Sequence, residues 1–166
     1  MSVSRQQTAP NTEPNTAPIE TPFKQIASLL GGRQVLKKSI TSKLDVHEVI
    51  VKGIPGRALK YMIAHAKIMN AADVLRAVGV SVRTVQRRMA TSRKPLSREQ
   101  SGRAWKFAEV LAKATEVFGS QAEAETWLAA PAMALDQRRP IDLLSSPAGV
   151  EMVEQLLGRL EYGVYT

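Results

Sequence analysis

A dense run of hydrogen-bonding and cationic side chains lies between residues 81 and 94 of this 166-residue chain. Its members are Ser81, Arg83, Thr84, Gln86, Arg87, Arg88, Arg93 and Lys94. Arginine can donate two parallel hydrogen bonds to guanine O6 and N7, and glutamine can bond adenine in the same way. Lysine and the remaining arginines suit phosphate oxygens, which fix the register of a protein on a duplex. These residue types therefore predict binding to double-stranded DNA.

Helical periodicity gathers these side chains on one surface. At about 100° per residue, the apolar residues of this stretch share a side and are expected to face the core. They are Val82, Val85 and Met89. Opposite them lie Arg83, Thr84 and Arg87, with Arg88 at one edge and Gln86 nearer the other. A helix over residues 82–89 would therefore present a polar, cationic face to DNA, with its N-terminus able to sit on a phosphate.

A preceding helix and a tight turn complete the pattern. Asn70 is a good N-cap, and Asp73 in the first turn is favoured by the helix dipole. That helix is expected to break at Gly79, after which Ser81 caps the next helix. Residues 70–89 thus predict a helix-turn-helix unit.

The pattern leaves an alternative open. Leu75 stands where many helix-turn-helix units have a small alanine, so we expect an altered crossing or a variant unit. The same residues also fit two ordinary amphipathic helices with a solvated basic face.

The distribution of charge along the chain favours DNA binding. Residues 33–106 carry 17 Lys and Arg against 4 Asp and Glu, whereas residues 107–166 carry 4 against 9. This asymmetry suggests nucleic-acid contact by one part and a different role for the other.

Composition limits the class of protein further. With 44% hydrophobic residues the chain can bury a core, and its length allows one domain or two small helical ones. The absence of cysteine excludes disulfides and thiolate zinc sites. No apolar run reaches the roughly 18 residues of a membrane span and no signal peptide is legible, so a cytoplasmic location is expected. Residues 1–20, rich in Thr, Pro, Asn and Gln, predict a disordered tail.

Almost every remaining signal is helical, and no alternating run of strand length appears, so the expected fold class is all-α. Capping patterns open helices at residues 45–48, 97–100 and 120–123, and Ser146-Pro147 opens the last one. The expected helices cover residues 21–30, 45–52, 57–69, 71–78, 82–89, 98–118, 121–130, 141–144 and 147–157. Gly158 marks the end of the last helix or a bend in it.

No catalytic constellation is legible in the chain. His47 and His65 are the only histidines and fall in different expected helices, where surface positions suit them better than metal ligation. Glu123 and Glu125 are expected on a solvated helix face. No thiol, glycine-rich phosphate loop or nucleophile–base pair is present. We therefore expect neither an enzyme nor a bound cofactor or metal.

The most specific stretches lie in the acidic part. They are residues 135–144, Leu-Asp-Gln-Arg-Arg-Pro-Ile-Asp-Leu-Leu, and residues 156–165, Leu-Leu-Gly-Arg-Leu-Glu-Tyr-Gly-Val-Tyr. Both resemble the C-terminal toxin-binding domain of the Xre/MbcA/ParS antitoxins. Further matches to that family lie upstream, at Gly53-Ile-Pro, residues 79–88, residues 96–103, Val117-Phe-Gly and Trp127-Leu followed by Pro131. The resemblance covers the chain from about residue 50 to its end.

The resemblance implies an Xre-like helix-turn-helix domain over residues 21–106 and a small helical toxin-binding domain over residues 107–166. It also implies a partner toxin encoded next door, commonly a RES-domain toxin that consumes NAD. The antitoxin's C-terminal end is expected to reach into or over the toxin's active site. The candidate toxin-binding residues are Leu135, Arg138, Leu144, Leu157, Arg159, Glu161, Tyr162, Val164, Tyr165 and Thr166.

This chain departs from the family pattern at one turn. Ala132-Met133 stands where the family usually has Asn-Pro, and Asp136-Gln137 where it usually has Gly-Gly. We therefore expect the turn before Arg138 to be formed differently, which makes the role of Arg138 less secure than that of the tail.

The physical chemistry of the last residues suits docking. Tyr162, Val164 and Tyr165 are apolar or amphipathic, and aromatic anchors with few torsions are good hot spots. Glu161 and the terminal carboxylate could pair with cationic groups in a site built for an anionic dinucleotide. The alternative is that both tyrosines fold back and pack on their own domain.

Three hypotheses remain at this stage. The first is an antitoxin that neutralises its toxin by direct binding and represses its own operon as a homodimer on operator DNA. The second is a stand-alone transcription regulator whose C-terminal domain only dimerises, so that deleting residues 162–166 leaves its role intact. The third is a pure protein inhibitor without DNA binding, for which Arg83→Ala with Arg87→Ala changes nothing at an operator.

Overall fold

The computed structural model describes residues 21–89 and 94–163, and of residues 86–89 the helical backbone alone. The expected tail at residues 1–20, Arg93 in the basic loop, and Val164, Tyr165 and Thr166 lie outside this part. Within the described ranges every regular element is a helix, which confirms the all-α class. The elements are α1 (Pro22–Leu29), α2 (Gly32–Leu36), α3 (Lys43–Lys52), α4 (Gly56–His65), α5 (Ala71–Val78), α6 (Val82–Met89), α7 (Arg98–Phe118), α8 (Gln121–Ala129), the 3₁₀ helix η1 (Met133–Leu135), α9 (Pro140–Leu143) and α10 (Pro147–Glu161). None of the described helices is both long and apolar enough to cross a membrane.

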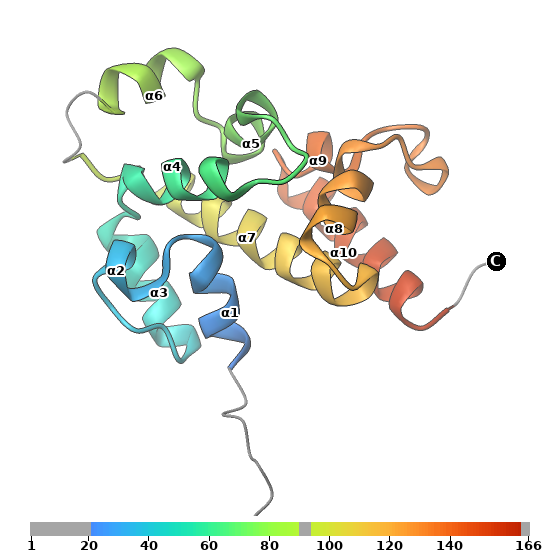
Figure 1. The fold of residues 1–166 in the computed structure, drawn as a ribbon, viewed down its shortest axis with the longest axis horizontal. Helices are drawn as coiled ribbons and strands as arrows, with labels where there is room; N and C mark the ends of the chain where they lie inside the picture. Colours follow the sequence, from blue (N-terminus) through green and yellow to red (C-terminus); the bar gives the residue numbers. More distant parts are fainter. Residues whose placement is uncertain (1–20, 90–93, 164–166) are drawn as a thin grey trace, which may run out of the picture.

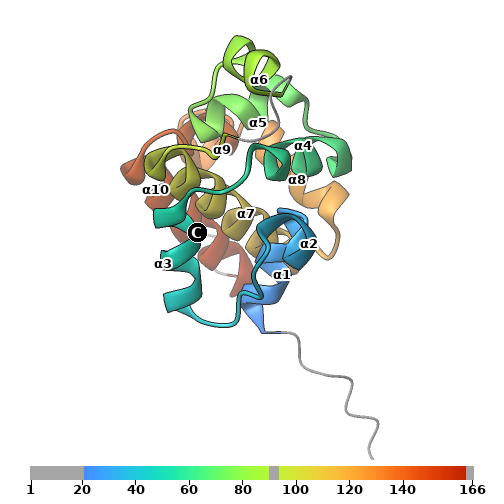
Figure 2. The same cartoon turned by 90° about the vertical axis from the view of Figure 1, so that its left-hand side faces the viewer.

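The long helix α7 runs through the middle of the molecule and joins its two halves (Figures 1 and 2). It packs against α1, α3, α5, α8 and α10. One continuous core includes Leu59 of α4, Phe107 and Leu111 of α7, and Leu157 of α10, all fully buried. In Figure 1, α6 and the C-terminal end of α10 lie at opposite ends of the long axis.

Local capping sets most of the helix starts. The predicted N-caps Asn70, Ser97, Ser120 and Ser146 each accept a hydrogen bond from the backbone N–H three residues later. The prediction of a capping box opened by Asp45 was wrong by three residues. Ser42 is the N-cap of α3, and the Asp45 carboxylate accepts the backbone N–H of Ser42 at 3.0 Å.

The helix predicted over residues 57–69 ends at His65, because a distant carboxylate takes the next backbone donors. Oε2 of Glu125, on α8, accepts the N–H groups of Lys67, Ile68 and Met69 at 2.7, 2.6 and 3.1 Å. Glu125 is fully buried, so the prediction of a solvated face was wrong for Glu125, whereas its neighbour Glu123 is exposed. Residues 66–70 thereby become a fixed connection between α4 and α5.

The last helix is longer than expected. Glycine lowers helix stability but does not end a helix that is packed along its side. α10 therefore continues through Gly158 to Glu161, where Nζ of Lys113 on α7 pairs with the Glu161 carboxylate at 3.1 Å. The short helix α2 was missed, because the Gly31-Gly32 pair suggested only an end to α1.

Candidate DNA-binding and partner-binding surfaces

The helix-turn-helix unit forms as its sequence predicts. Gly79 ends α5 with a left-handed φ of 73°, and the N–H of Val80 donates to the carbonyl of Leu75 at 2.8 Å. The hydroxyl of Ser81 then accepts the N–H of Thr84 at 3.1 Å and opens α6. Leu75 is 3% exposed, so the core accommodates this larger residue where many such units have alanine.

The outer surface of α6 carries the predicted polar residues as far as the described side chains extend. Arg83 is exposed, Thr84 is half-buried, and Lys94 beyond the helix is exposed. Gln86, Arg87, Arg88 and Arg93 have no described side chains; the first three lie on the α6 backbone.

Only one of the valines predicted to face the core does so. Val85 is buried, but Val82 is 48% exposed. The reason is that α6 packs mainly against α4 and lies at the end of the molecule, so its first turn has little to pack against (Figure 1). Val82 is therefore an apolar side chain on the surface next to Arg83.

Side chains of α7 contact the turn of the helix-turn-helix at Gly79. A Cβ atom built on Gly79 would lie 2.3 Å from Nη1 of Arg103, so the guanidinium rests directly against the turn. Nη2 of Arg103 pairs with Glu99 one turn earlier at 2.7 Å, which fixes the arginine. The amide of Gln100 also donates to the Gly79 carbonyl at 3.4 Å. Sequence reasoning missed these contacts, because Gln100 and Arg103 are 21 and 24 residues from Gly79 along the chain.

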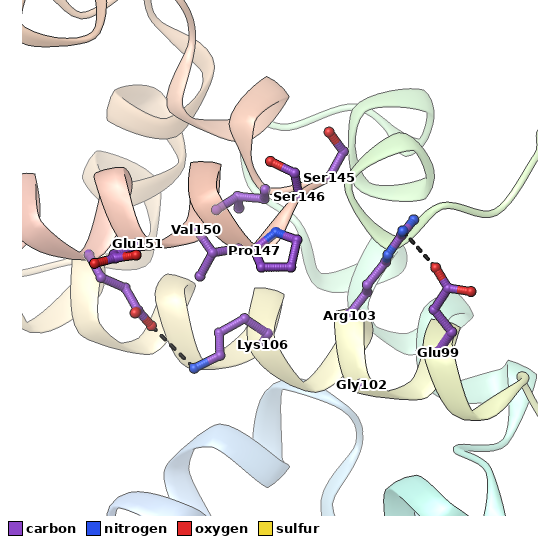
Figure 3. Close-up of a pocket in the computed structure, with 11 residues that line it drawn as sticks. Glu99, Gly102, Arg103, Lys106, Ser145, Ser146, Pro147, Val150 and Glu151 are labelled. Atoms are coloured by element: carbon purple, nitrogen blue, oxygen red, sulfur yellow. Dashed lines mark hydrogen bonds and ion pairs between the residues drawn. The ribbon is translucent and has the colours of Figure 1, made fainter.

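A cavity of about 590 Å³ lies between α7 and the start of α10 (Figure 3). Its cationic lining residues are paired: Arg103 with Glu99, and Lys106 with Glu154 at 3.2 Å. Elsewhere, the imidazole of His65 stacks on Tyr61 with ring centroids 3.9 Å apart. Among the described residues no three His, Asp or Glu side chains gather where a metal ion could be held.

The candidate toxin-binding residues separate into buried and exposed sets. Leu135, Leu144 and Leu157 are 3, 4 and 0% exposed. They pack inside the domain, and their direct contact with a partner stays a prediction. Arg138, Arg159, Glu161 and Tyr162 are exposed. Apolar leucines at helical spacing are explained by the core that they fill.

The exposed residues include a continuous outer face of α10. Met152, Gln155, Arg159 and Tyr162 follow one another at helical spacings of three and four. Tyr162 is 79% exposed and Met152 45% exposed. A shallow hollow of about 520 Å³ lies beside Gly158, between Gln155, Arg159 and Tyr162. Glu161 is held by Lys113, so its first role is to hold the end of α10 on α7.

The turn before Arg138 has a backbone that favours glycine. Asp136 and Gln137 adopt left-handed φ values of 53° and 62°. The N–H of Ala132 donates to the carbonyl of Arg138 at 3.1 Å and closes the turn. The side chains of this chain therefore occupy positions where a Gly-Gly pair is free of strain.

Replacing Gln137 by glycine is expected to raise the free energy of unfolding by about 0.5–1 kcal/mol. A residue with a Cβ is strained in the left-handed region by ~1–2 kcal/mol, and the greater freedom of glycine in the unfolded chain offsets part of this gain. Urea unfolding measures the change. Gln137→Ala keeps the Cβ and serves as the control, and equal stability of the two variants would contradict the expectation.

Comparison with known proteins identifies two domains in this chain. Residues 45–109 match the family model of the antitoxin Xre-like helix-turn-helix domain, and residues 113–163 match that of the antitoxin Xre/MbcA/ParS C-terminal toxin-binding domain. The chain is 35% identical to antitoxin Xre of Yersinia enterocolitica over 96 residues, which are 57% of this chain and 64% of that protein.

Two further relatives bear the same name. Antitoxin Xre of Photorhabdus laumondii is 30% identical over 93 residues, 55% of this chain and 62% of that protein. Antitoxin Xre of Pseudomonas putida is 25% identical over 124 residues, 75% of this chain and 76% of that protein. The first two matches thus span a little less than two thirds of the relatives' lengths. With both domains present in this order along one chain, the protein belongs to the Xre/MbcA/ParS family of antitoxins.

Proposed function

We propose that this chain is an antitoxin that neutralises a cognate toxin by direct binding and represses its own operon by binding operator DNA. The observation that carries the proposal is the placement of two exposed surfaces at opposite ends of one body: α6, and the C-terminal end of α10 (Figure 1). A chain built this way can hold DNA and a protein partner together. The role is one of binding, without catalysis.

The DNA-binding part, proposed as residues 21–106, is supported by charge and by shape. α6 projects from the body, and the Arg83 side chain is exposed on it. The clustered Lys and Arg of residues 33–106 supply the long-range attraction to phosphates. Helix-turn-helix proteins commonly read two half-sites, so we propose a homodimer on the operator.

The toxin-binding part, proposed as residues 107–166, is supported by the outer face of α10. A tyrosine that is 79% exposed at a helix end, next to Arg159, has the composition of an interface hot spot. A tyrosine that folded back onto its own domain would be covered, whereas Tyr162 is exposed. This exposure supports docking of the tail on a partner. By family resemblance we propose a RES-domain, NAD-degrading toxin whose active site is occluded by this end. We also propose a cytoplasmic location, where both partners would be met.

The test is to express the neighbouring reading frame in the host, with and without this protein, while growth and cellular NAD are measured. The proposal expects the neighbour alone to stop growth and deplete NAD, and this chain to restore both. Growth arrest without NAD loss would overturn the RES assignment alone. A harmless neighbour, or no protection, would overturn the toxin-neutralising function and leave a DNA-binding regulator.

Arg83→Ala is expected to weaken operator binding by about 1–3 kcal/mol and to relax specificity at one base pair, if this arginine contacts a base edge. Lys94→Ala is the matched control, because loss of a phosphate contact weakens binding to all sequences alike. Fluorescence anisotropy with single-base operator variants separates the two patterns. An Arg83→Ala variant that behaves as Lys94→Ala does would assign Arg83 to the phosphate backbone.

A further inference from the structure

A network of four charged side chains joins the first helix of the helix-turn-helix to the C-terminal part. Arg139, just before α9, contacts Asp73 of α5 with Nη2 and Nη1 at 3.2 and 3.4 Å. The same guanidinium donates to Asp142 of α9 through Nε and Nη2 at 2.8 and 2.7 Å. Nη1 of Arg76, on α5, completes the network by donating to Asp142 at 3.2 Å.

The Asp142 carboxylate of this network is ionised at neutral pH. The hydrogen bonds from Arg139 hold the pKa of Asp142 below its ordinary value, and Arg76 adds to the effect. The Asp73 side chain is buried, at 7% exposure, whereas that of Asp142 is 38% exposed. Paired charges with bidentate arginine geometry fix both distance and orientation, which single point charges on flexible stems do not.

A second contact holds the chain immediately before α5. The buried Glu125 of α8 binds the backbone of residues 67–69, and Asn70 caps α5 directly after them. α5 also packs along α9. The start of α5 and its first two turns are therefore positioned by side chains from the C-terminal part.

The position of α5 decides that of α6. Only Gly79, Val80 and Ser81 separate the two helices, and the Val80 N–H is bonded back to Leu75 of α5. A shift or rotation of α5 therefore moves α6 by a similar amount. A displacement of about 1 Å is enough to spoil hydrogen bonds to base edges, because these bonds weaken steeply with distance and angle.

We infer that Arg139 and Asp142 are positioning residues for DNA binding: the C-terminal part aligns the recognition helix through their contacts with α5, although neither residue lies on the helix-turn-helix. This inference rests on the proposed operator binding. On this inference the toxin-binding part also positions the recognition helix on DNA.

Asp142→Asn tests the inference, because positioning and general electrostatics predict opposite changes in operator affinity. The substitution removes a negative charge, so general attraction to DNA should rise. Positioning predicts the opposite, because an amide nitrogen would face Nε or Nη2 of Arg139 and break the bidentate pair. We expect operator affinity to fall about fivefold or more, the lower range of measured couplings between sites. The probe is a fluorescent duplex from upstream of the protein's own reading frame.

Asp136→Asn is the matched control. It makes the same charge change in the same part of the chain, at an exposed position whose left-handed φ of 53° asparagine tolerates. Its operator affinity should equal or exceed that of the unmodified protein. A thermal melt of each variant, and its binding to the neighbouring reading frame's product, separate misalignment of α6 from general unfolding. Misalignment lowers DNA affinity alone.

Equal operator affinities for Asp142→Asn and Asp136→Asn would overturn the inference and leave the proposed function intact. Absence of operator binding by the unmodified protein would overturn both. If Asp142→Asn is unfolded at the assay temperature, Arg76→Gln replaces it, because this side chain is 59% exposed and contributes one 3.2 Å bond to the network. Arg76→Gln is compared with Arg33→Gln, which makes the same charge change at an exposed residue of α2. Equal operator affinities of these two variants would overturn the inference, and a lower affinity of Arg76→Gln would support it.

Discussion

Replacing Glu125 by alanine is expected to lower the free energy of unfolding by about 3–5 kcal/mol, the largest effect of any single change considered for stability. One carboxylate oxygen accepts three successive backbone N–H groups, of Lys67, Ile68 and Met69. The other accepts the amide of Gln121 at 2.7 Å. Alanine leaves these buried and part-buried donors without their acceptor, and each unpaired buried donor costs ~1–3 kcal/mol.

The control is Glu125→Gln, which keeps an acceptor oxygen of the same reach and loses only the charge. We expect it to recover most of the stability lost in Glu125→Ala, because the backbone donors still find a partner. Urea unfolding followed by circular dichroism measures both variants. Since a domain of this size has a total stability of roughly 5–15 kcal/mol, Glu125→Ala could leave a substantial unfolded fraction. A loss below 1 kcal/mol for Glu125→Ala would contradict the assigned role.

Deleting residues 162–166 is expected to abolish protection against the cognate toxin while leaving the fold intact. The deletion begins after Glu161, so α10 and its pair with Lys113 are retained. Within the described part it removes Tyr162, which is 79% exposed and supports no core. Tyr162→Ala alone should weaken binding by about 2 kcal/mol or more, roughly 30-fold, as for an aromatic hot spot. Pull-down and growth rescue with the neighbouring reading frame's product measure the effect.

Leu44→Ala is the matched control for Tyr162→Ala. Leu44 is an apolar residue of α3 that is 66% exposed, and α3 lies away from the C-terminal end of α10 (Figure 1). Its variant should protect fully. Full protection by the truncated chain would instead favour a stand-alone regulator whose C-terminal part only dimerises. Loss of protection together with loss of the folded state would show that the tail is structural.

The helices and the turn of the helix-turn-helix were predictable from the sequence because local hydrogen bonds determine them. The caps at Asn70, Ser97, Ser120 and Ser146 each act over three residues, and Gly79 adopts the left-handed conformation that ends α5. Such signals do not depend on where the rest of the chain lies. The charge asymmetry and the family motifs were likewise visible in the order of residues alone.

Tertiary structure determined the features that local sequence patterns cannot report. Glu125 and the backbone that it binds are 56 to 58 residues apart, so nothing near either end revealed that α4 stops at His65 or that this carboxylate is buried. Val82 is exposed although it shares the apolar side of α6 with Val85, a difference that periodicity within the helix cannot report. Leu135, Leu144 and Leu157, predicted to contact a partner, fill the core.

The sequence by itself determined the all-α class, the helix-turn-helix and the family, since each depends on residues within a few positions of one another. The pairing of Asp73 with Arg139, 66 residues away, was decided only when α7 brought α5 and α9 together. The same packing placed α6 and the end of α10 at opposite ends of the molecule. Long-range pairs form because burial of a shared core offsets the conformational entropy of bringing them together, and that balance belongs to the whole chain.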